Sequence, residues 1–142
     1  MVWKLWTDPE LVKRWWGPKN FTSPSASIDF RENGKSLVSM RAPKEMGGQE
    51  WYSIWRYVKI CHLETIEFIQ SLADQDGNKV DPVKVNMPAD FPLDIKTVVT
   101  FRVLTENKTE MTVTEHANFG SISNFAQVGL EQSVDKMAAI FN

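Results

Sequence analysis

The sequence predicts an α+β domain in which one long C-terminal helix covers an antiparallel sheet. Three observations predict this class. Apolar residues recur at helical spacing at both ends of the chain, they alternate with a period of two in between, and turn residues separate the alternating segments. With 142 residues, 42% hydrophobic and 24% charged, the chain suits one domain that buries its own core. We expect a single domain over residues 1–142.

Two short helices are expected at the N-terminus. Residues 2–6 form the first, and the second begins at Thr7, whose hydroxyl can cap it with Glu10 as the capping-box partner. Helical spacing continues to Trp16, and a Gly-Pro pair then ends the helix. Four of the six tryptophans fall within this stretch. They are most simply core residues, but one or two could instead line a cavity entrance, where a flat ring suits an aromatic ligand.

Six strands are expected between the terminal helices. A strand through Ile28 and Phe30 and a return strand through Val38 and Met40 flank the Asn-Gly pair at 33–34, a strong hairpin-turn signal. The other four strands cover residues 51–62, 65–73, 96–104 and 110–117. Strands joined in sequence by turns predict an antiparallel meander.

A long loop over residues 74–95 shows little periodicity and is rich in aspartate and proline. A loop of this length is uncommon in a compact domain and is often functional, for example as a lid. A plain surface loop explains the sequence equally well, and both interpretations stay open.

The last helix is expected from Ser123 onward. Its apolar stripe is Ala126, Leu130, Val134, Met137 and Phe141. Charged residues lie off this stripe, so we expect the helix to lay the stripe on the concave face of the sheet.

The charge balance excludes some functions. Sixteen basic and 18 acidic residues give a net charge of −2, which argues against a nucleic-acid partner. No apolar run approaches the ~20 residues of a membrane helix, and the N-terminus lacks a signal-peptide pattern. The single cysteine excludes an internal disulfide. We therefore expect a soluble, cytoplasmic protein.

Several segments carry a family resemblance. They are VWKLWTDPE at residues 2–10, WWGP at 15–18, DFRENG at 29–34, MRAP at 40–43, YVKI at 57–60, DQDGN at 74–78, MPADFP at 87–92 and GLEQSVDK at 129–136. Together the chain resembles the activator-of-heat-shock-protein-90-ATPase homologue-like family over nearly its whole length. The resemblance implies the START-like, or helix-grip, fold: a curved antiparallel sheet around a long C-terminal helix, with a cavity between them. It also implies a possible chaperone partner and a link to stress responses.

Three departures from the family pattern are visible. Family members normally carry a strand before the first helix, where this sequence has Met1, so either the start is truncated or the sheet has lost a terminal strand. Of the proline and glutamate that the family usually has near residues 61–64, only Glu64 remains. Leu130 stands where the family commonly has tryptophan after Gly129. That change would enlarge or reshape the cavity beside the helix.

Metal binding and nucleophilic catalysis find little support in the sequence. Two histidines and one cysteine fall short of the three or four ligands of a typical zinc site, and we expect no metal and no cofactor. Cys61 with the distant His116 lacks an elbow or oxyanion motif, so a small buried thiol is the simpler interpretation.

The cavity is therefore the main candidate site, and strand 51–62 has two faces that could line it. One carries Ile54, Arg56 and Val58, and the other carries Trp51, Trp55 and Tyr57. We predict that the first faces the helix, because it has the better aliphatic row. On strand 110–117 the inner face is expected to carry Met111, Val113 and Glu115. Inward Arg56 and Glu115 could pair, meet water at an open cavity mouth, or hold the polar end of a ligand.

The expected function is binding of a small apolar or aromatic molecule in this cavity. The candidate lining residues are Trp15, Ile28, Phe30, Met40, Ile54, Arg56, Val58, Phe68, Val99, Phe101, Met111, Val113, Glu115, Phe125, Gly129, Leu130 and Met137. One alternative is a protein-interaction module of the co-chaperone kind, with Trp51 and Trp55 as exposed candidates. Another is a cyclase- or hydrolase-like enzyme, with Glu115, Asp29 or His116 as acid or base. An uncovered sheet edge also predicts a homodimer.

Overall fold

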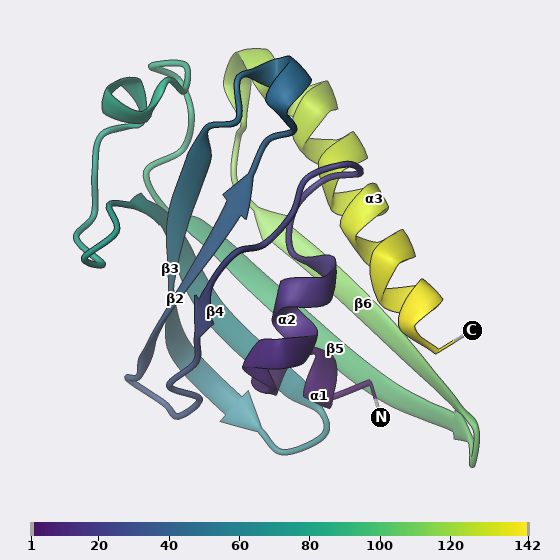
Figure 1. The fold of residues 1–142 in the computed structure, drawn as a ribbon. Helices are drawn as coiled ribbons and strands as arrows, with labels where there is room; N and C mark the ends of the chain where they lie inside the picture. The colour runs from purple at the N-terminus through teal and green to yellow at the C-terminus, as the bar shows by residue number, and fades with distance from the viewer. Residues whose placement is uncertain (1, 142) are drawn as a thin grey trace.

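The computed structural model describes residues 2–141, which form one six-stranded antiparallel sheet with helices on its concave side (Figure 1). Each strand pairs with its neighbours in the chain, so β1 and β6 are the edges. The strands are β1 (Ala26–Ser27), β2 (Lys35–Arg41), β3 (Glu50–Cys61), β4 (Thr65–Ala73), β5 (Ile95–Thr105) and β6 (Lys108–His116). The predicted meander of six strands is confirmed.

The N-terminal helices are α1 (Lys4–Thr7) and α2 (Pro9–Trp15). The cap of α2 is Asp8 rather than the predicted Thr7: its carboxylate accepts a hydrogen bond from the Glu10 N–H at 2.9 Å. Pro9 explains the shift, because a residue before proline is driven to extended backbone, which is the conformation of an N-cap. The helix ends before Gly17, whose φ of 106° only glycine adopts readily.

The first predicted strand is shorter than expected. β1 has two residues, and Ile28 and Phe30 lie beyond it in the connection to β2, where both pack against the core. The turn before β2 is tightened by the Gly34 N–H, which donates to the Arg31 carbonyl at 2.8 Å. Asn33 takes the left-handed conformation with φ 66°. The Asn-Gly pair thus makes a turn, but one wider than a two-residue hairpin.

The core lies where α1 and α2 meet the middle of the sheet. Aromatic rings dominate it: Trp15 lies 6.3 Å from Trp55, and Trp55 stacks on Phe68 at 4.9 Å. Trp6 joins them at 4.6 Å from Trp15. The interpretation of the N-terminal tryptophans as core residues therefore holds for Trp3, Trp6 and Trp15, whereas Trp16 lines the cavity described below.

The last helix, α3 (Ser123–Ile140), runs beside α2 and β6 across the concave side (Figure 1). Four members of the predicted stripe, Ala126, Leu130, Val134 and Met137, are at least half-buried. The fifth, Phe141, is exposed just beyond the end of the helix.

The long loop contains the short 3-10 helix η2 (Pro82–Val85). The Val85 carbonyl accepts hydrogen bonds from Trp51 Nε1 at 2.7 Å and from Gln49 Nε2 at 2.9 Å. Near its end, the Asp94 carboxylate accepts from Lys79 and Ser71, both at 2.7 Å. The loop is thereby fastened to the sheet at two places.

Candidate ligand-binding cavity

A cavity of about 130 Å³ lies between the inner face of the sheet and α3. Its walls are mostly apolar, with a few polar side chains. Lining residues are Trp16, Gly17 and Pro18 after α2, Met40, Ser53, Gln70, Leu72, Ile95 and Glu115 on the strands, Met87, Phe91, Phe119 and Ile122 on the connections, and Phe125, Ala126, Gly129, Leu130 and Ser133 on α3.

The floor of the cavity follows from strand register. Ser53 is paired with Leu72, and Gln70 is paired with Ile95, so these side chains project from the same face. Glu115 extends the floor on the edge strand β6.

The roof of the cavity is held by hydrogen bonds between α3 and the turn after α2. Ser133 Oγ donates to the Gly17 carbonyl at 2.9 Å, and the Lys19 N–H donates to Gln132 Oε1 at 3.1 Å. Lys136 Nζ donates to the Phe21 carbonyl at 3.1 Å. These bonds anchor the helix along one side of the cavity.

Small side chains on α3 leave the hollow open beneath it. Ala126, Gly129 and Ser133 all face it. A Cβ on Gly129 would lie 3.4 Å from Pro18 Cγ, an ordinary van der Waals contact with the turn after α2.

Hydrogen bonds and an aromatic contact join the two connections that line one side of the cavity, which stays open to solvent. The Asp90 carboxylate accepts hydrogen bonds from the Ser121 N–H at 2.8 Å and from its hydroxyl at 2.9 Å. These bonds hold the pKa of Asp90 below its usual range. Beside them, Phe91 and Phe119 meet edge to face at 5.9 Å. The long loop is thus tied to the short 3-10 helix η3 (Gly120–Ile122) that leads into α3.

Glu115 is the ionisable side chain of the cavity wall. Burial raises the pKa of its carboxyl to about 7. Within residues 2–141, no hydrogen bond or ion pair reaches this carboxyl. The side chains around it are apolar or neutral, and no lysine, arginine or histidine of the described chain lines the cavity. The cavity wall therefore offers an ionisable acceptor, Glu115, together with the indole N–H of Trp16, which is buried without a partner in the described part of the chain.

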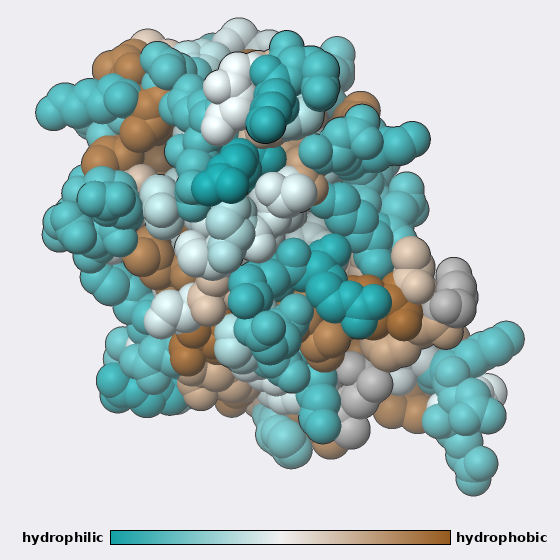
Figure 2. All heavy atoms as spheres, in the orientation of Figure 1, coloured by the Kyte–Doolittle hydropathy of each residue, from teal (hydrophilic) through white to brown (hydrophobic). Residues whose placement is uncertain are grey.

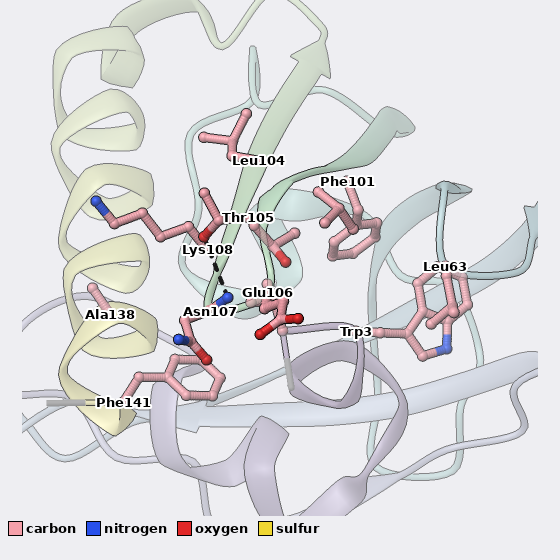
Figure 3. Close-up of a pocket in the computed structure, with 13 residues that line it drawn as sticks. Trp3, Leu63, Phe101, Leu104, Thr105, Glu106, Asn107, Lys108, Ala138 and Phe141 are labelled. Carbon is pink, nitrogen blue, oxygen red and sulfur yellow. Dashed lines mark hydrogen bonds between the residues drawn. The ribbon is translucent and has the colours of Figure 1, made fainter.

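A second hollow is an open groove of about 870 Å³ at the opposite end of the molecule (Figure 3). It lies between the β5–β6 hairpin, the start of α1 and the end of α3, and Leu104, Leu63 and Phe141 are exposed there. Figure 2 shows apolar surface between the end of α3 and this hairpin. The hairpin tip is shaped by the Asn107 N–H, which donates to Thr105 Oγ1 at 3.3 Å. Both hollows open to solvent, and we take the one beneath α3 as the candidate ligand site because it lies between the sheet and the long helix.

Comparison with known protein families gives one match, and it spans the whole chain. The family described as Activator of Hsp90 ATPase homolog 1-like protein matches residues 1–142. The chain belongs to this family. Among curated proteins, no relative matches the sequence.

Solved structures show the same fold at low identity. A protein from Chromobacterium violaceum has a TM-score of 0.77 at 20% identity, with 98% of this chain and 85% of that chain covered. A solution structure from Arthrobacter aurescens has a TM-score of 0.75 at 24% identity, covering 98% and 76%. A family member from Silicibacter pomeroyi has a TM-score of 0.70 at 16% identity, covering 99% and 87%. The START-like helix-grip fold expected from the resemblance is confirmed.

In the protein described here, the cavity contains five of the lining residues that the sequence predicted. They are Met40, Glu115, Phe125, Gly129 and Leu130. Nine others pack in or against the hydrophobic core: Trp15, Ile28, Phe30, Phe68, Val99, Phe101, Met111, Val113 and Met137. Of these, Phe101 also reaches the open groove. Sequence periodicity identified the inner face of β6, but not which of its residues border a hollow.

The predicted inner face of β3 is wrong. Trp55 and Tyr57 lie in the core, whereas Arg56 is exposed on the outer face, where its guanidinium lies 3.5 Å from Asp94. Ile54 and Val58 do not line the cavity either: Ile54 is buried on the outer face, and Val58 is 50% exposed at a β-bulge. The bulge explains the misleading aliphatic row, because an extra residue switches the strand's phase and brings Ile60 back against the core.

Several lining residues were missed. Gln70 and Leu72 alternate with Phe68 on β4, and this period of two could have placed all three on one face. Phe91, Phe119 and Ser133 gave no comparable signal, because loop geometry and helix docking place them.

The other candidate catalytic side chains lie apart from the cavity. Asp29 is half-buried and pairs with Arg31 at 2.9 Å, and His116 is exposed on β6. Within residues 2–141, no three His, Cys, Asp or Glu side chains come together as metal ligands. In that same part of the chain, no helix is long and apolar enough to cross a membrane.

Proposed function

We propose that this protein is a binding module that takes up a small apolar or aromatic molecule in the cavity beneath α3. The observation that carries the proposal is a hollow with mostly apolar walls and a few placed polar groups, which is the usual composition of a ligand pocket. Glu115 stands there without the second acid or base that an enzyme of this fold would need, which favours binding over catalysis.

The size of the cavity limits the ligand. An apolar protein cavity of ~150 Å³ is large enough to bind benzene. A volume of about 130 Å³ therefore suits a single ring with at most a short substituent.

Binding can be tested by thermal shift and tryptophan emission across a library of small ring compounds. Trp16 lines the cavity and lies 5.2 Å from Trp55, so an occupant should change emission. A ligand at 100 times its Kd should stabilise the fold by about 2.7 kcal/mol.

The matched variants are Leu130→Trp, which places a large ring in the cavity wall, and Val128→Trp, at an exposed position two residues away on α3. We expect Leu130→Trp to abolish binding while Val128→Trp retains it. Hits that bind all three proteins equally would contradict the proposal, and so would a library without hits.

A second candidate function is protein interaction, which the open groove and the free edge of β6 favour. The interaction surface does not include Trp51 and Trp55, which the sequence suggested for it. Trp55 is 0% exposed, and the Trp51 indole N–H donates a hydrogen bond to the Val85 carbonyl. The partner we propose is a second copy of this chain, pairing through β6, which has no proline to block pairing. Sedimentation at tens of micromolar should then show a dimer, and a monomer would contradict it.

The family description adds an Hsp90-type chaperone as a partner to test by ATPase stimulation.

A further inference from the structure

We propose that the cavity selects a small ring compound carrying a protonated amine, with the Glu115 carboxylate as its counter-charge. This inference rests on the proposed binding function and names the chemical class of its ligand. It starts from the ionisable group of the cavity wall, the Glu115 carboxyl, which receives no hydrogen bond or ion pair within residues 2–141; the Trp16 indole N–H in the same wall is also without a partner there.

Among residues 2–141, no lysine, arginine or histidine lines the cavity that Glu115 borders. Across the sheet its register partner is Thr97, whose hydroxyl lies 3.4 Å from the Ile95 carbonyl. Phe119 and Ile122 from the connection and Phe125 and Ala126 from α3 complete the wall. Asp90, next to the lining residue Phe91, accepts a hydrogen bond from the Ser121 N–H. A cation that neutralises Glu115 must therefore arrive with a ligand.

Aromatic rings in the same wall favour an ammonium group over other cations. Trp16, Phe91, Phe119 and Phe125 all line the cavity. Aromatic faces attract organic ammonium ions through their quadrupole, and a carboxylate adds a charge-assisted hydrogen bond. Apolar walls then accept the ring to which the amine is attached.

Protonation makes the proposal directional. Since the pKa of Glu115 is raised to about 7, the carboxylate forms near neutral pH and is lost below it. An amine-bearing ligand should therefore bind more tightly as the pH rises through this range. A neutral ring should show the opposite trend or none, because it gains nothing from a charged neighbour.

The experiment compares benzylamine, which stays protonated in this range, with toluene, which carries the same ring without charge. Affinities are measured by calorimetry and NMR titration at about pH 5.5 and about pH 8, on either side of the Glu115 transition. We expect benzylamine to bind about tenfold more tightly at the higher pH, since a charge-assisted bond is worth roughly that factor or more. The affinity for toluene should not rise between the two pH values.

Two variants separate the charge from the fold. Glu115→Gln keeps the shape, so it should remove the pH dependence and weaken benzylamine about tenfold at the higher pH. Glu110→Gln, on the same strand but exposed and paired with Arg102, should leave both ligands unchanged.

The outcomes distinguish this inference from the function on which it rests. Suppose toluene binds, but the affinity for benzylamine does not rise with pH or is unchanged in Glu115→Gln. The amine assignment is then overturned, and the binding function stands. If neither compound binds, and the library tested against Leu130→Trp also gives no hits, both proposals fail.

Discussion

The concave side of the sheet has two halves that are filled in different ways. Under α1 and α2, large rings from the helices meet large rings from the sheet, as where Trp15 and Trp55 stack beside Phe68. Under α3, three of the five residues that face the sheet are small, Ala126, Gly129 and Ser133, and a hollow remains between them and the larger Phe125 and Leu130. The comparison teaches that helix position alone does not make a START-like cavity. The size of the side chains that face the sheet decides which half is packed and which stays open.

The largest expected effect contrasts the two halves directly. Trp55→Ala removes a fully buried ring from the packed half and should lower the free energy of unfolding by about 3–5 kcal/mol. Leu130→Ala, in the wall of an existing hollow, should cost about 1–2 kcal/mol, because its side chain is only half-buried. Urea unfolding of both variants measures the difference. Equal losses would show that the two halves are packed alike.

The next effect concerns pH and the cavity wall. The folded-state pKa of Glu115, about 7, lies above its unfolded value of 4.5, so the folded protein holds an extra proton between these pH values. The contribution of this group to stability is therefore present below about pH 4.5 and is lost as the pH rises through about 7.

Glu115→Gln should remove this dependence and be more stable than the wild type by about 2 kcal/mol at pH 8. The two proteins should converge as the pH falls toward 5. Thermal unfolding across this range checks it, with Glu110→Gln as the exposed control on the same strand. A constant difference between the proteins at all pH values would contradict the burial of this carboxyl.

A smaller effect should distinguish two indoles within the packed half. Trp15 Nε1 donates to the Leu5 carbonyl at 2.7 Å, whereas Trp55 Nε1 is buried and has no acceptor in the described part of the chain. Trp15→Phe should therefore cost about 1–2 kcal/mol more than Trp55→Phe, because it leaves a buried carbonyl unpaired. Both substitutions remove the same atoms, so denaturant unfolding compares their losses in free energy of unfolding directly. A larger loss for Trp55→Phe than for Trp15→Phe would refute the prediction.

The smallest effect tests the orientation of β3. Arg56 lies on the outer face and is half-exposed, and its contact with Asp94 is long. Arg56→Ala should therefore change the free energy of unfolding by about 0.5 kcal/mol or less. It should also leave ligand affinity unchanged. A loss of several kcal/mol in the free energy of unfolding would contradict the placement of Arg56 on the outer face.

Sequence periodicity predicted the elements of this fold well. The six strands, the two N-terminal helices and the long C-terminal helix follow from local patterns, because strand and helix periods are properties of neighbouring residues. The inner face of β6, with Glu115 on it, follows from the same alternation. The bulge at Val58 was not predictable in this way, since it depends on how β3 pairs with β4.

What the sequence by itself determined is the α+β class, the meander and the presence of a carboxyl on the inner face of β6, because each depends on short-range spacing. Only the tertiary structure decided where the hollow lies. Its position depends on where α3 is anchored to residues 17–21, and on where the long loop is joined to Ser121 through Asp90. These are contacts between segments up to about a hundred residues apart, and no local pattern in the chain encodes them.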